Sequence, residues 1–283
     1  MPAPLLAVDT PSLLYRAFYA LPTKITGADG MPVNALLGAV NMLLREVDAH
    51  EPRAVVCCSG PDAAAYRVEL YEGYHAQRPP MPDELVPQWE KAPALFEAFG
   101  WRTHRHDTLE ADDLLGAYAA AERRAGGEAL LLTGDRDMYQ CAGDGVAVLY
   151  LRTGSQGAQV VDAEEVERRY GVPPALVPDF IALRGDPSDG LPGAKGVGEK
   201  TAAELLRRHG SLEAAMAAAR DERKRVATAL TDERLTAYKE IATLQPVEVE
   251  LPPDTPTDRA GGAAAARELG MERLAARLEG PED

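Results

Sequence analysis

The sequence predicts an α/β protein, in which a mostly parallel central sheet flanked by helices is followed by a helical module. Two observations lead to this prediction. In the first half, short continuous apolar runs alternate with segments of helical periodicity, which is typical of a parallel sheet covered on both faces. After about Asp162 the apolar runs fade while the helical periodicity continues. We therefore expect an α/β core over residues 1–162 and a helical module over residues 163–283, packed on the sheet rather than tethered by a linker.

Four apolar runs of strand length define the expected sheet, and helical patterns separate them. The strands are expected at residues 5–8, 54–58, 129–133 and 146–151, and helices at 12–21, 33–47 and 111–124. Between residues 71 and 94 the pattern breaks into Tyr, Pro and charged residues, although helical periodicity resumes near Asp83. We expect an exposed insertion there, either a place of substrate contact or a plain surface loop.

The second half reads as a series of helices without an internal repeat. Helical patterns cover residues 163–170, 174–183, 199–208, 212–220 and 233–244, and a last helix is expected near 263–278. Residues 247–251 alternate between apolar and acidic side chains and predict one edge strand before a proline-rich stretch.

Composition excludes several classes of protein. The chain has 283 residues, with 30 Lys+Arg against 45 Asp+Glu, a net charge of −15. No apolar run approaches the ~18 residues of a membrane span, and no charged-then-apolar leader opens the chain. The 3 Cys lack the spacing of a zinc site or a disulfide framework. We expect a soluble cytoplasmic protein; its acidity leaves the partner open, because carboxylates gathered around metal ions also count toward net charge.

Acidic residues follow the expected strands and open the expected helices. Asp9 follows the first strand, and Asp135 and Asp137 follow the third, at the sheet edge where open parallel sheets bind ligands. The full set is Asp9, Glu110, Asp112, Asp113, Asp135, Asp137, Asp186 and Asp189. Each alone is explained as a cap. Together they would repel one another unless cations occupied the site, and oxygen-only ligands select Mg²⁺ or Mn²⁺. The pattern predicts a site with two or more metal ions for phosphoryl transfer.

Residues 191–202 have the pattern of a helix-hairpin-helix turn, which we place at about 185–209. Glycines permit a left-handed backbone and close approach of another molecule, and the following helix start offers free N–H groups to a DNA phosphate. The residues expected to bind DNA are Lys195, Gly196, Val197, Gly198, Lys200 and Thr201. The carbonyl groups of such a turn can also hold a monovalent cation such as K⁺.

These motifs resemble the 5′ nuclease domain of bacterial DNA polymerase I and its free-standing relatives, the flap endonucleases. The resemblance runs from about residue 5 to residue 244, and includes Tyr66-Arg67, Gly73-Tyr74 with Arg78, and the segment 133–140. It implies a PIN-like nuclease core with a helix-hairpin-helix module, and a Mg²⁺-dependent enzyme that trims 5′ ends and flaps of DNA in replication and repair. Because no polymerase domain follows, we expect a stand-alone, monomeric member whose protein partners the sequence does not reveal.

The resemblance also implies roles for particular residues. Asp9, Glu110, Asp112 and Asp135 would serve the first metal with Asp113 near it, and Asp137, Asp186 and Asp189 would serve the second. Arg16 and Arg67 would steer the phosphate. The insertion at 71–94 would form an arch over the 5′ strand, with Arg78 among its catalytic residues and Tyr74 stacked on a base.

Two departures from the family pattern affect the expected site. Gly60 stands where the family usually has a metal-binding Asp, and Asp62 is a poor substitute. His75 stands where the arch normally carries a catalytic Lys, so we expect His75 to take that role, the alternative being a solvated loop residue. Elsewhere, His104 and His106 are expected as ordinary strand-end residues.

Tyr15 and Phe18 are expected to lie in the hydrophobic core.

Two other functions are compatible with the sequence. The departures at Gly60 and His75 also fit a DNA-junction-binding protein that has lost its catalytic activity. A third reading, a Mg²⁺ phosphohydrolase acting on small phosphates, fits worst, because such an enzyme has no use for a DNA hairpin.

Overall fold

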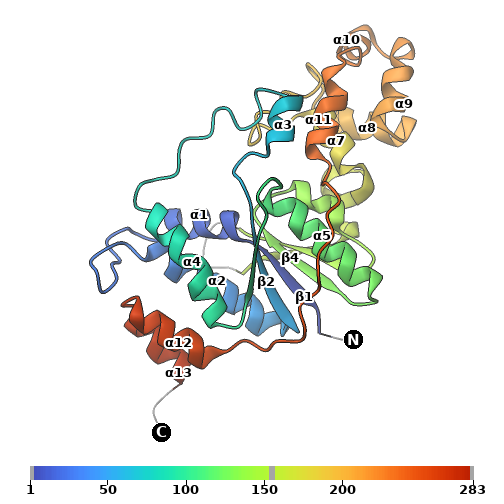
Figure 1. Ribbon diagram of the computed structural model, residues 1–283. Helices are drawn as coiled ribbons and strands as arrows, with labels where there is room; N and C mark the ends of the chain where they lie inside the picture. The colour runs from blue at the N-terminus through green and yellow to red at the C-terminus, as the bar shows by residue number, and fades with distance from the viewer. Residues whose placement is uncertain (1–2, 153–156, 281–283) are drawn as a thin grey trace.

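A computed structural model describes residues 3–152 and 157–280, and shows a central sheet with helices on both faces (Figure 1). The sheet has six strands in the order β3-β2-β1-β4-β5-β6. The first five run parallel, and β6 is antiparallel to β5. The strands are β1 (Leu5–Asp9), β2 (Ala54–Ser59), β3 (Arg102–Arg105), β4 (Ala129–Thr133), β5 (Val146–Tyr150) and β6 (Gln159–Val161). The expected mostly parallel α/β core is confirmed.

The central strand β1 divides the core into two halves. All five of its residues are buried, because successive side chains of a strand point to opposite faces. Leu5 and Ala7 join one apolar cluster, and Leu6 and Val8 join the other. A continuous apolar run was therefore the right signal for a strand covered on both sides.

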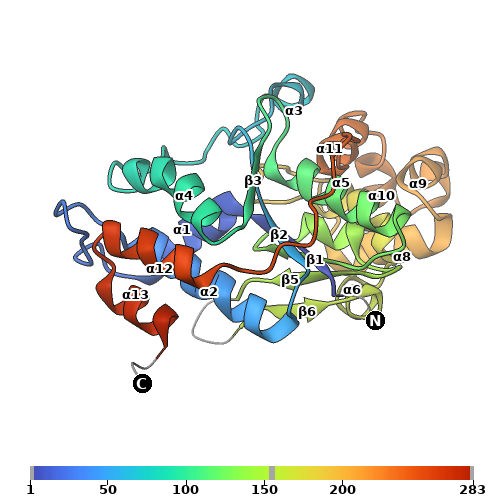
Figure 2. The same ribbon diagram turned by 60° about the horizontal axis from the view of Figure 1, so that its bottom comes forward.

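The helices divide between these two faces (Figure 2). The Leu6 face is covered by α1 (Thr10–Ala20), α2 (Asn34–His50), α4 (Val86–Ala98), α12 (Arg259–Glu268) and α13 (Glu272–Glu279). The Leu5 face is covered by α5 (Ala111–Arg124), α6 (Ala163–Tyr170) and α7 (Val177–Arg184). The helical module continues with α8 (Glu199–His209), α9 (Leu212–Ala217), α10 (Lys224–Ala229) and α11 (Arg234–Ala242), and shares the Leu5-face core. The module is thus packed on the sheet, as expected. The remaining elements are α3 (Ala65–Leu70) and the 3₁₀ turns η1 (Asp137–Cys141), η2 (Pro174–Leu176) and η3 (Ala219–Asp221).

The chain returns from α11 to α12 as an extended segment along the molecule, in which the edge strand expected at 247–251 does not form (Figure 1). Side chains of the sheet region hold this segment by its carbonyl and hydroxyl groups. The Nη1 group of Arg102 donates to Glu250 O at 3.2 Å, and the indole of Trp101 donates to Thr257 Oγ1 at 2.9 Å. Its alternating apolar residues pack on the core, which produced the strand-like pattern.

Three further expectations are corrected. The last helix is two helices, because the chain turns at Gly270 with φ +76°. Residues 86–94 belong to α4, whose Gln88 is buried and accepts from Ala35 N at 2.7 Å, so only 71–85 of the expected arch is irregular. Strands β3 and β6 were not predicted because both are short, with four and three residues, and the four side chains of β3 are polar. Within 3–152 and 157–280, no helix is both long and apolar enough to cross a membrane.

Candidate active site

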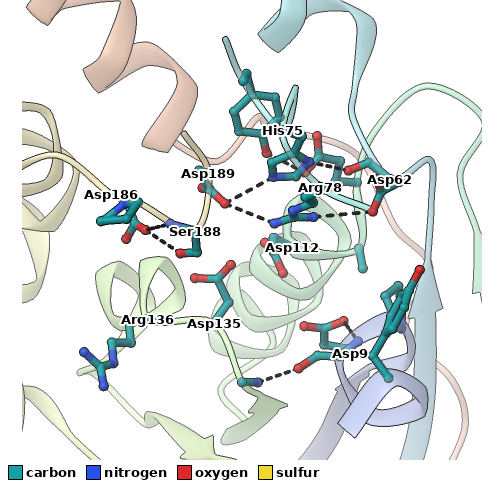
Figure 3. A pocket seen from close by; sticks show the side chains of 18 of the residues that line it. Asp9, Asp62, His75, Arg78, Asp112, Asp135, Arg136, Asp186, Ser188 and Asp189 are labelled. Carbon is teal, nitrogen blue, oxygen red and sulfur yellow. Dashed lines mark hydrogen bonds and ion pairs between the residues drawn. The ribbon is translucent and has the colours of Figure 1, made fainter. Parts of the chain in front are cut away.

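A cavity of about 990 Å³ opens at the carboxyl ends of the central strands (Figure 3). In the strand order, β2 and β3 lie on one side of β1, and β4 and β5 lie on the other. Open α/β folds bind ligands at the carboxyl ends of the strands where the strand order reverses in this way. Acids from distant parts of the sequence line the cavity: Asp9, Asp112, Asp135 and Asp186. Asp189, Glu110 and Asp62 also line it. The structure therefore brings together the acid clusters that the sequence placed after strands and at helix starts.

Asp9 is held rigidly at the end of β1. One carboxylate oxygen caps α1 by accepting from Ser12 N at 2.9 Å, and the other accepts from Thr133 Oγ1 at 2.7 Å. Burial nevertheless raises the pKa of Asp9, and the nearby charge of Glu110 raises it further. Asp9 thus links the ends of β1 and β4 while carrying a charge that burial disfavours.

Asp112 and Asp135 carry the clearest electrostatic strain in the cavity. Burial, followed by the charges of Asp135 and Asp9, raises the pKa of Asp112 well above its ordinary value. Burial, followed by the charge of Asp189, raises the pKa of Asp135 to about 7. Asp135 is fixed by the Asp137 N–H, which donates at 2.8 Å. For both residues, repulsion from neighbouring carboxylates adds to the cost of burying the charge.

Such a donor set fits a hard divalent cation. Carboxylate oxygens prefer Mg²⁺ and Mn²⁺, and a bound cation would remove the repulsion that raises these pKa values. Over the described residues, however, no group of three or more His, Cys, Asp or Glu side chains is close enough to hold a metal ion as it stands. The acids share one cavity but do not form a preassembled coordination group.

The loop 185–191 supplies the second group of acids. Asp186 accepts from Ser188 N at 2.8 Å and also from the Ser188 hydroxyl, and its other oxygen accepts from Arg184 Nη2 at 3.0 Å. The loop is closed by paired backbone hydrogen bonds between Asp186 and Leu191, of 2.9 and 2.8 Å. Gly185 begins it with φ +85°, and a Cβ there would lie 2.7 Å from Leu191 O. The local turn therefore fixes where Asp186 and Asp189 point.

His75 and Arg78 bind the arch segment to Asp189 (Figure 3). The His75 Nε2 atom lies 3.1 Å from Asp189 Oδ1, and Nδ1 lies 2.6 Å from Asp62 O. Both partners are hydrogen-bond acceptors, so each ring nitrogen faces an oxygen that can accept from it. Arg78 Nη2 donates to the same Asp189 oxygen at 3.1 Å, and its Nη1 to Asp62 at 3.4 Å. His75 is 9% exposed, so the alternative of a solvated loop residue is wrong.

Three predicted site residues form a buried ion-pair network instead. Arg67 is 3% exposed and pairs with Glu110 at 2.7 Å and with Asp113 at 2.9 Å. Asp113 is fully buried; it completes a capping box with Glu110 and accepts from Gln245 N at 2.8 Å. Arg67 therefore does not reach a phosphate in this structure, and Asp113 is not positioned for a metal. Glu110 lines the cavity, but its oxygens already accept from Ala64 N at 2.6 Å and Tyr74 Oη at 2.9 Å.

Tyr74 does not match the expected base-stacking role in this conformation. Its ring is 5% exposed and stacks on His75 with a centroid distance of 3.8 Å. Because its hydroxyl donates to Glu110, the ring fastens the arch to the start of α5. Tyr74 borders the cavity, but one face of its ring is covered by His75 and little of the residue is exposed, so a base cannot stack on it without a rearrangement.

Arg16 and Asp137 lie behind the cavity rather than on it. A Cβ at Gly134 would lie 3.0 Å from Arg16 Nη2, which places this guanidinium against the loop after β4. Among the described residues, the buried Arg16 Nε has no hydrogen-bond partner. Asp137 is buried; desolvation, followed by the charge of Asp135, raises its pKa well above the ordinary value.

Gly60 is required by the packing around it. A Cβ at position 60 would lie 3.0 Å from Glu110 Cα and closer still to the Leu109 carbonyl oxygen. A carboxylate side chain therefore does not fit this backbone path. Asp62 does not replace it, since its exposed side chain turns to Arg78.

Several cavity residues were missed by sequence reasoning. Arg136 and Arg184 line the cavity and bring positive charge to it. Each lies within two residues of a predicted acid, and this proximity in the sequence could have indicated their place in the site. Tyr15, expected in the core, instead lines the cavity, edge-on to Trp89 with ring centroids 5.9 Å apart. Only the fold brings α1 and α4 together. Phe18 is buried in the core as expected.

His104 and His106, expected as ordinary strand-end residues, both make hydrogen bonds within the fold. His104 lies in β3 with Nδ1 2.9 Å from Tyr118 Oη. His106 accepts from Leu109 N at 3.0 Å in the turn before α5. Of the described residues that line the cavity, neither is a member.

The glycine hairpin lies at one end of the cavity, which Gly198 and Glu199 border. Gly196 has φ +79° and is exposed, while Lys195, Gly198 and Lys200 are exposed and Thr201 is half-buried. Val197 departs from the expectation: its side chain is 6% exposed and its N–H donates to Ala194 O at 2.9 Å. It closes the turn rather than facing a ligand.

Two family models match the chain. A model described as the 5'-3' exonuclease N-terminal resolvase-like domain matches residues 4–171, and one described as the 5'-3' exonuclease C-terminal SAM fold matches residues 172–261. A 5'-3' exonuclease of Mycobacterium tuberculosis is 37% identical over 99% of this chain and 98% of the relative. One of Streptomyces coelicolor is 38% identical over 95% of this chain and 94% of the relative. The thermostable DNA polymerase I of Thermus thermophilus is 36% identical over 90% of this chain, which spans 31% of that polymerase.

Solved structures share the fold at low sequence identity. T5 5'-exonuclease with bound divalent metal ions (zinc) is 16% identical, with a TM-score of 0.66 over 97% of this chain and 98% of the other. The catalytic core of Rad2 in complex with DNA substrate is 15% identical, with a TM-score of 0.63 over 97% of this chain and 90% of the other. With two matching family models and full-length relatives, the chain belongs to the 5'-3' exonuclease family.

Proposed function

We propose that this chain is a structure-specific 5' nuclease that hydrolyses DNA phosphodiesters with Mg²⁺ or Mn²⁺. The single observation that carries the proposal is the cavity at the ends of β1 and β4, which Asp9, Asp112, Asp135 and Asp186 line together. Burial and mutual repulsion raise the pKa values of the first three, so the folded chain has a strained anionic site. The full-length relatives named 5'-3' exonuclease support the same function.

The residues divide into those suited to hold cations and those suited to hold the substrate. Asp9, Asp112 and Asp135 would hold a first ion, and Asp186 with Asp189 and the buried Asp137 a second. When bound, such ions supply an activated water and charge stabilisation at the leaving oxygen. Arg78 and Arg136 line the same cavity and would orient the phosphate by charge-assisted hydrogen bonds. Arg16 would add positive charge from behind the loop after β4.

The helical module would bind the duplex part of the substrate. The exposed hairpin offers the N–H groups of Gly196 and Gly198, the start of α8, and the side chains of Lys195, Lys200 and Thr201. These contacts read the DNA backbone rather than its bases. The hairpin carbonyl groups would hold a K⁺ ion, which predicts tighter duplex binding in KCl than in NaCl.

Two statements about organisation belong to the proposal. Residues 1–162 would act as the nuclease core and residues 163–283 as the DNA-binding module, a division close to the junction of the two family models at 171 and 172. The protein would act as a monomer, which light scattering after size exclusion tests.

The decisive assay uses a 5'-labelled DNA flap with Mg²⁺ or Mn²⁺. The wild type should release the flap only when a divalent ion is present, and Asp135→Asn should lose at least about 100-fold in rate, as expected when one of several groups acting together is removed. Asp107→Asn, an exposed acid outside the cavity, is the matched control and should cleave normally. Equal cleavage by the wild type and Asp135→Asn would overturn the proposal.

A second candidate function is a DNA-junction binder without chemistry. Gly60 favours it, because one acid of the family pattern is missing and the packing at Leu109 and Glu110 leaves no room for it. The same assay separates the two. Tight binding of the flap with no cleavage in either ion would favour the binder.

A further inference from the structure

The basic segment that follows α9 includes an arginine that rests directly on the glycine hairpin. A Cβ at Gly196 would lie 2.6 Å from Arg225 Nε and 2.8 Å from Arg225 Cζ. The guanidinium therefore occupies the space that any other residue at position 196 would fill. The missing side chain at Gly196 serves Arg225 as well as the left-handed turn at φ +79°.

Arg225 is held over the hairpin by its own helix. Helix α8 leaves the hairpin at Gly198 and ends at His209, where His209 Nε2 lies 2.9 Å from Glu222 Oε1. Arg208 pairs with the same carboxylate oxygen. Glu222 precedes α10 by two residues, so the end of α8 fixes the start of α10 and turns Arg225 back toward the hairpin.

The guanidinium of Arg225 is available to bind an anion. Among the described residues it has no ion pair and no hydrogen bond, and it is exposed. By contrast, Arg78 and Arg184, which line the cavity, are paired with the carboxylates of Asp189 and Asp186. An exposed, unpaired guanidinium packed on a backbone turn suits a DNA phosphate, because its planar fork can donate two hydrogen bonds to two phosphate oxygens.

We infer that Arg225 completes the phosphate seat of the hairpin, so that the DNA backbone is bound jointly by the turn at Gly196 and by α10. This inference rests on the proposed function, since it assigns the hairpin to duplex DNA. Binding is of the sequence-independent kind, in which each neutralised phosphate adds about 0.9 to the salt slope of log K for B-DNA.

The test measures binding of a fluorescein-labelled blunt duplex by the full chain in EDTA, by anisotropy over a range of salt. Arg225→Gln should weaken binding about 5- to 10-fold and lower the salt slope by about 1. Arg225→Lys keeps the charge and should retain most of the affinity. Arg273→Gln removes one exposed arginine from α13, at the opposite end of the molecule from α10, and should bind as the wild type does (Figure 1).

Flap cleavage supplies the second readout. Arg225→Gln should raise KM about 5- to 10-fold with kcat unchanged. A phosphate contact away from the reacting atoms binds the substrate and the transition state equally well, so its loss weakens substrate binding without slowing the chemical step. Gly196→Ala should reproduce the loss of affinity with unchanged far-UV circular dichroism, since it displaces the same guanidinium. Wild-type affinity and salt slope in Arg225→Gln, or an equal loss in Arg273→Gln, would overturn the inference while leaving the nuclease proposal intact. A wild type that neither binds duplex nor cleaves flaps would overturn both.

Discussion

Asp135→Asn should stabilise the metal-free protein, and more at neutral to alkaline pH than at acidic pH. The pKa of Asp135 is about 7 in the folded chain and about 3.8 when unperturbed. A raised carboxyl pKa means that the folded state binds the proton more tightly than the unfolded chain does. Stability is therefore lost as pH rises from about 4 to about 7, and the loss is complete above that window.

The magnitude follows from the same pKa values. A difference of about 3 corresponds to at most about 4 kcal/mol at 1.36 kcal/mol per pKa unit. Since Asp135 lines an open cavity where water screens its charge, and since Asp9 and Asp112 share the repulsion, we expect about 1–2 kcal/mol. Asn keeps the oxygen that accepts from Asp137 N, so the loop after β4 should hold its shape.

Urea unfolding in EDTA at about pH 5 and about pH 8 measures this effect. Asp135→Asn should exceed the wild type in free energy of unfolding by about 1–2 kcal/mol at the higher pH, with most of that advantage lost at the lower. Asp107→Asn should match the wild type at both. An Asp135→Asn protein that is no more stable than the wild type at about pH 8, or that gains equally at both pH values, would refute the reasoning.

Three further perturbations test other parts of the site. Gly60→Asp should cost at least about 2 kcal/mol in urea unfolding and should not raise activity, because a Cβ there meets the Leu109 carbonyl; a stable, more active variant would contradict this packing argument. Arg67→Met should cost about 3–5 kcal/mol in thermal unfolding, since it leaves the buried Asp113 unpaired, and a change below about 1 kcal/mol would show that the network is unimportant. His75→Ala should slow flap cleavage about 10-fold by releasing Asp189 from the arch, whereas an unchanged rate and pH–rate profile would remove His75 from the mechanism.

The meeting of the acids at one edge of the sheet could be predicted from the sequence. A buried apolar strand followed at once by Asp9, and another followed by Asp135, can be placed without knowing any contact, because parallel strands end at the same edge. The helix-hairpin-helix turn could also be predicted from the sequence, because its closely spaced glycines are followed directly by a helical pattern.

The division of labour among those acids could not be predicted. Asp112 and Asp113 are adjacent, yet one lines the cavity while the other is buried against Arg67. Helical geometry points neighbouring residues in different directions, and only the position of α3 decides which acid meets an arginine. Tyr74 was misjudged for the same reason, because its partners Glu110 and His75 lie on different segments.

Close approaches between backbones were also invisible in the sequence. In the sequence, Gly60 indicates only that a carboxylate of the family pattern is missing. The structure shows that the chain after β2 packs against the start of α5 at this position. Arg225 lies in a helix that the periodicity did not predict, and its contact with Gly196 depends on how Glu222 is held by α8. Such contacts depend on the tertiary path of the chain rather than on local pattern.

Calorimetric titration of Mn²⁺ into the metal-free protein at about pH 7.5 tests the central claim most directly. If acids from separate segments form one cation site, the wild type and Asp107→Asn should bind Mn²⁺ alike, and Asp135→Asn should bind at least about 10-fold more weakly. Equal Mn²⁺ affinity in Asp135→Asn and the wild type would contradict the claim that this cavity is the metal site of the enzyme.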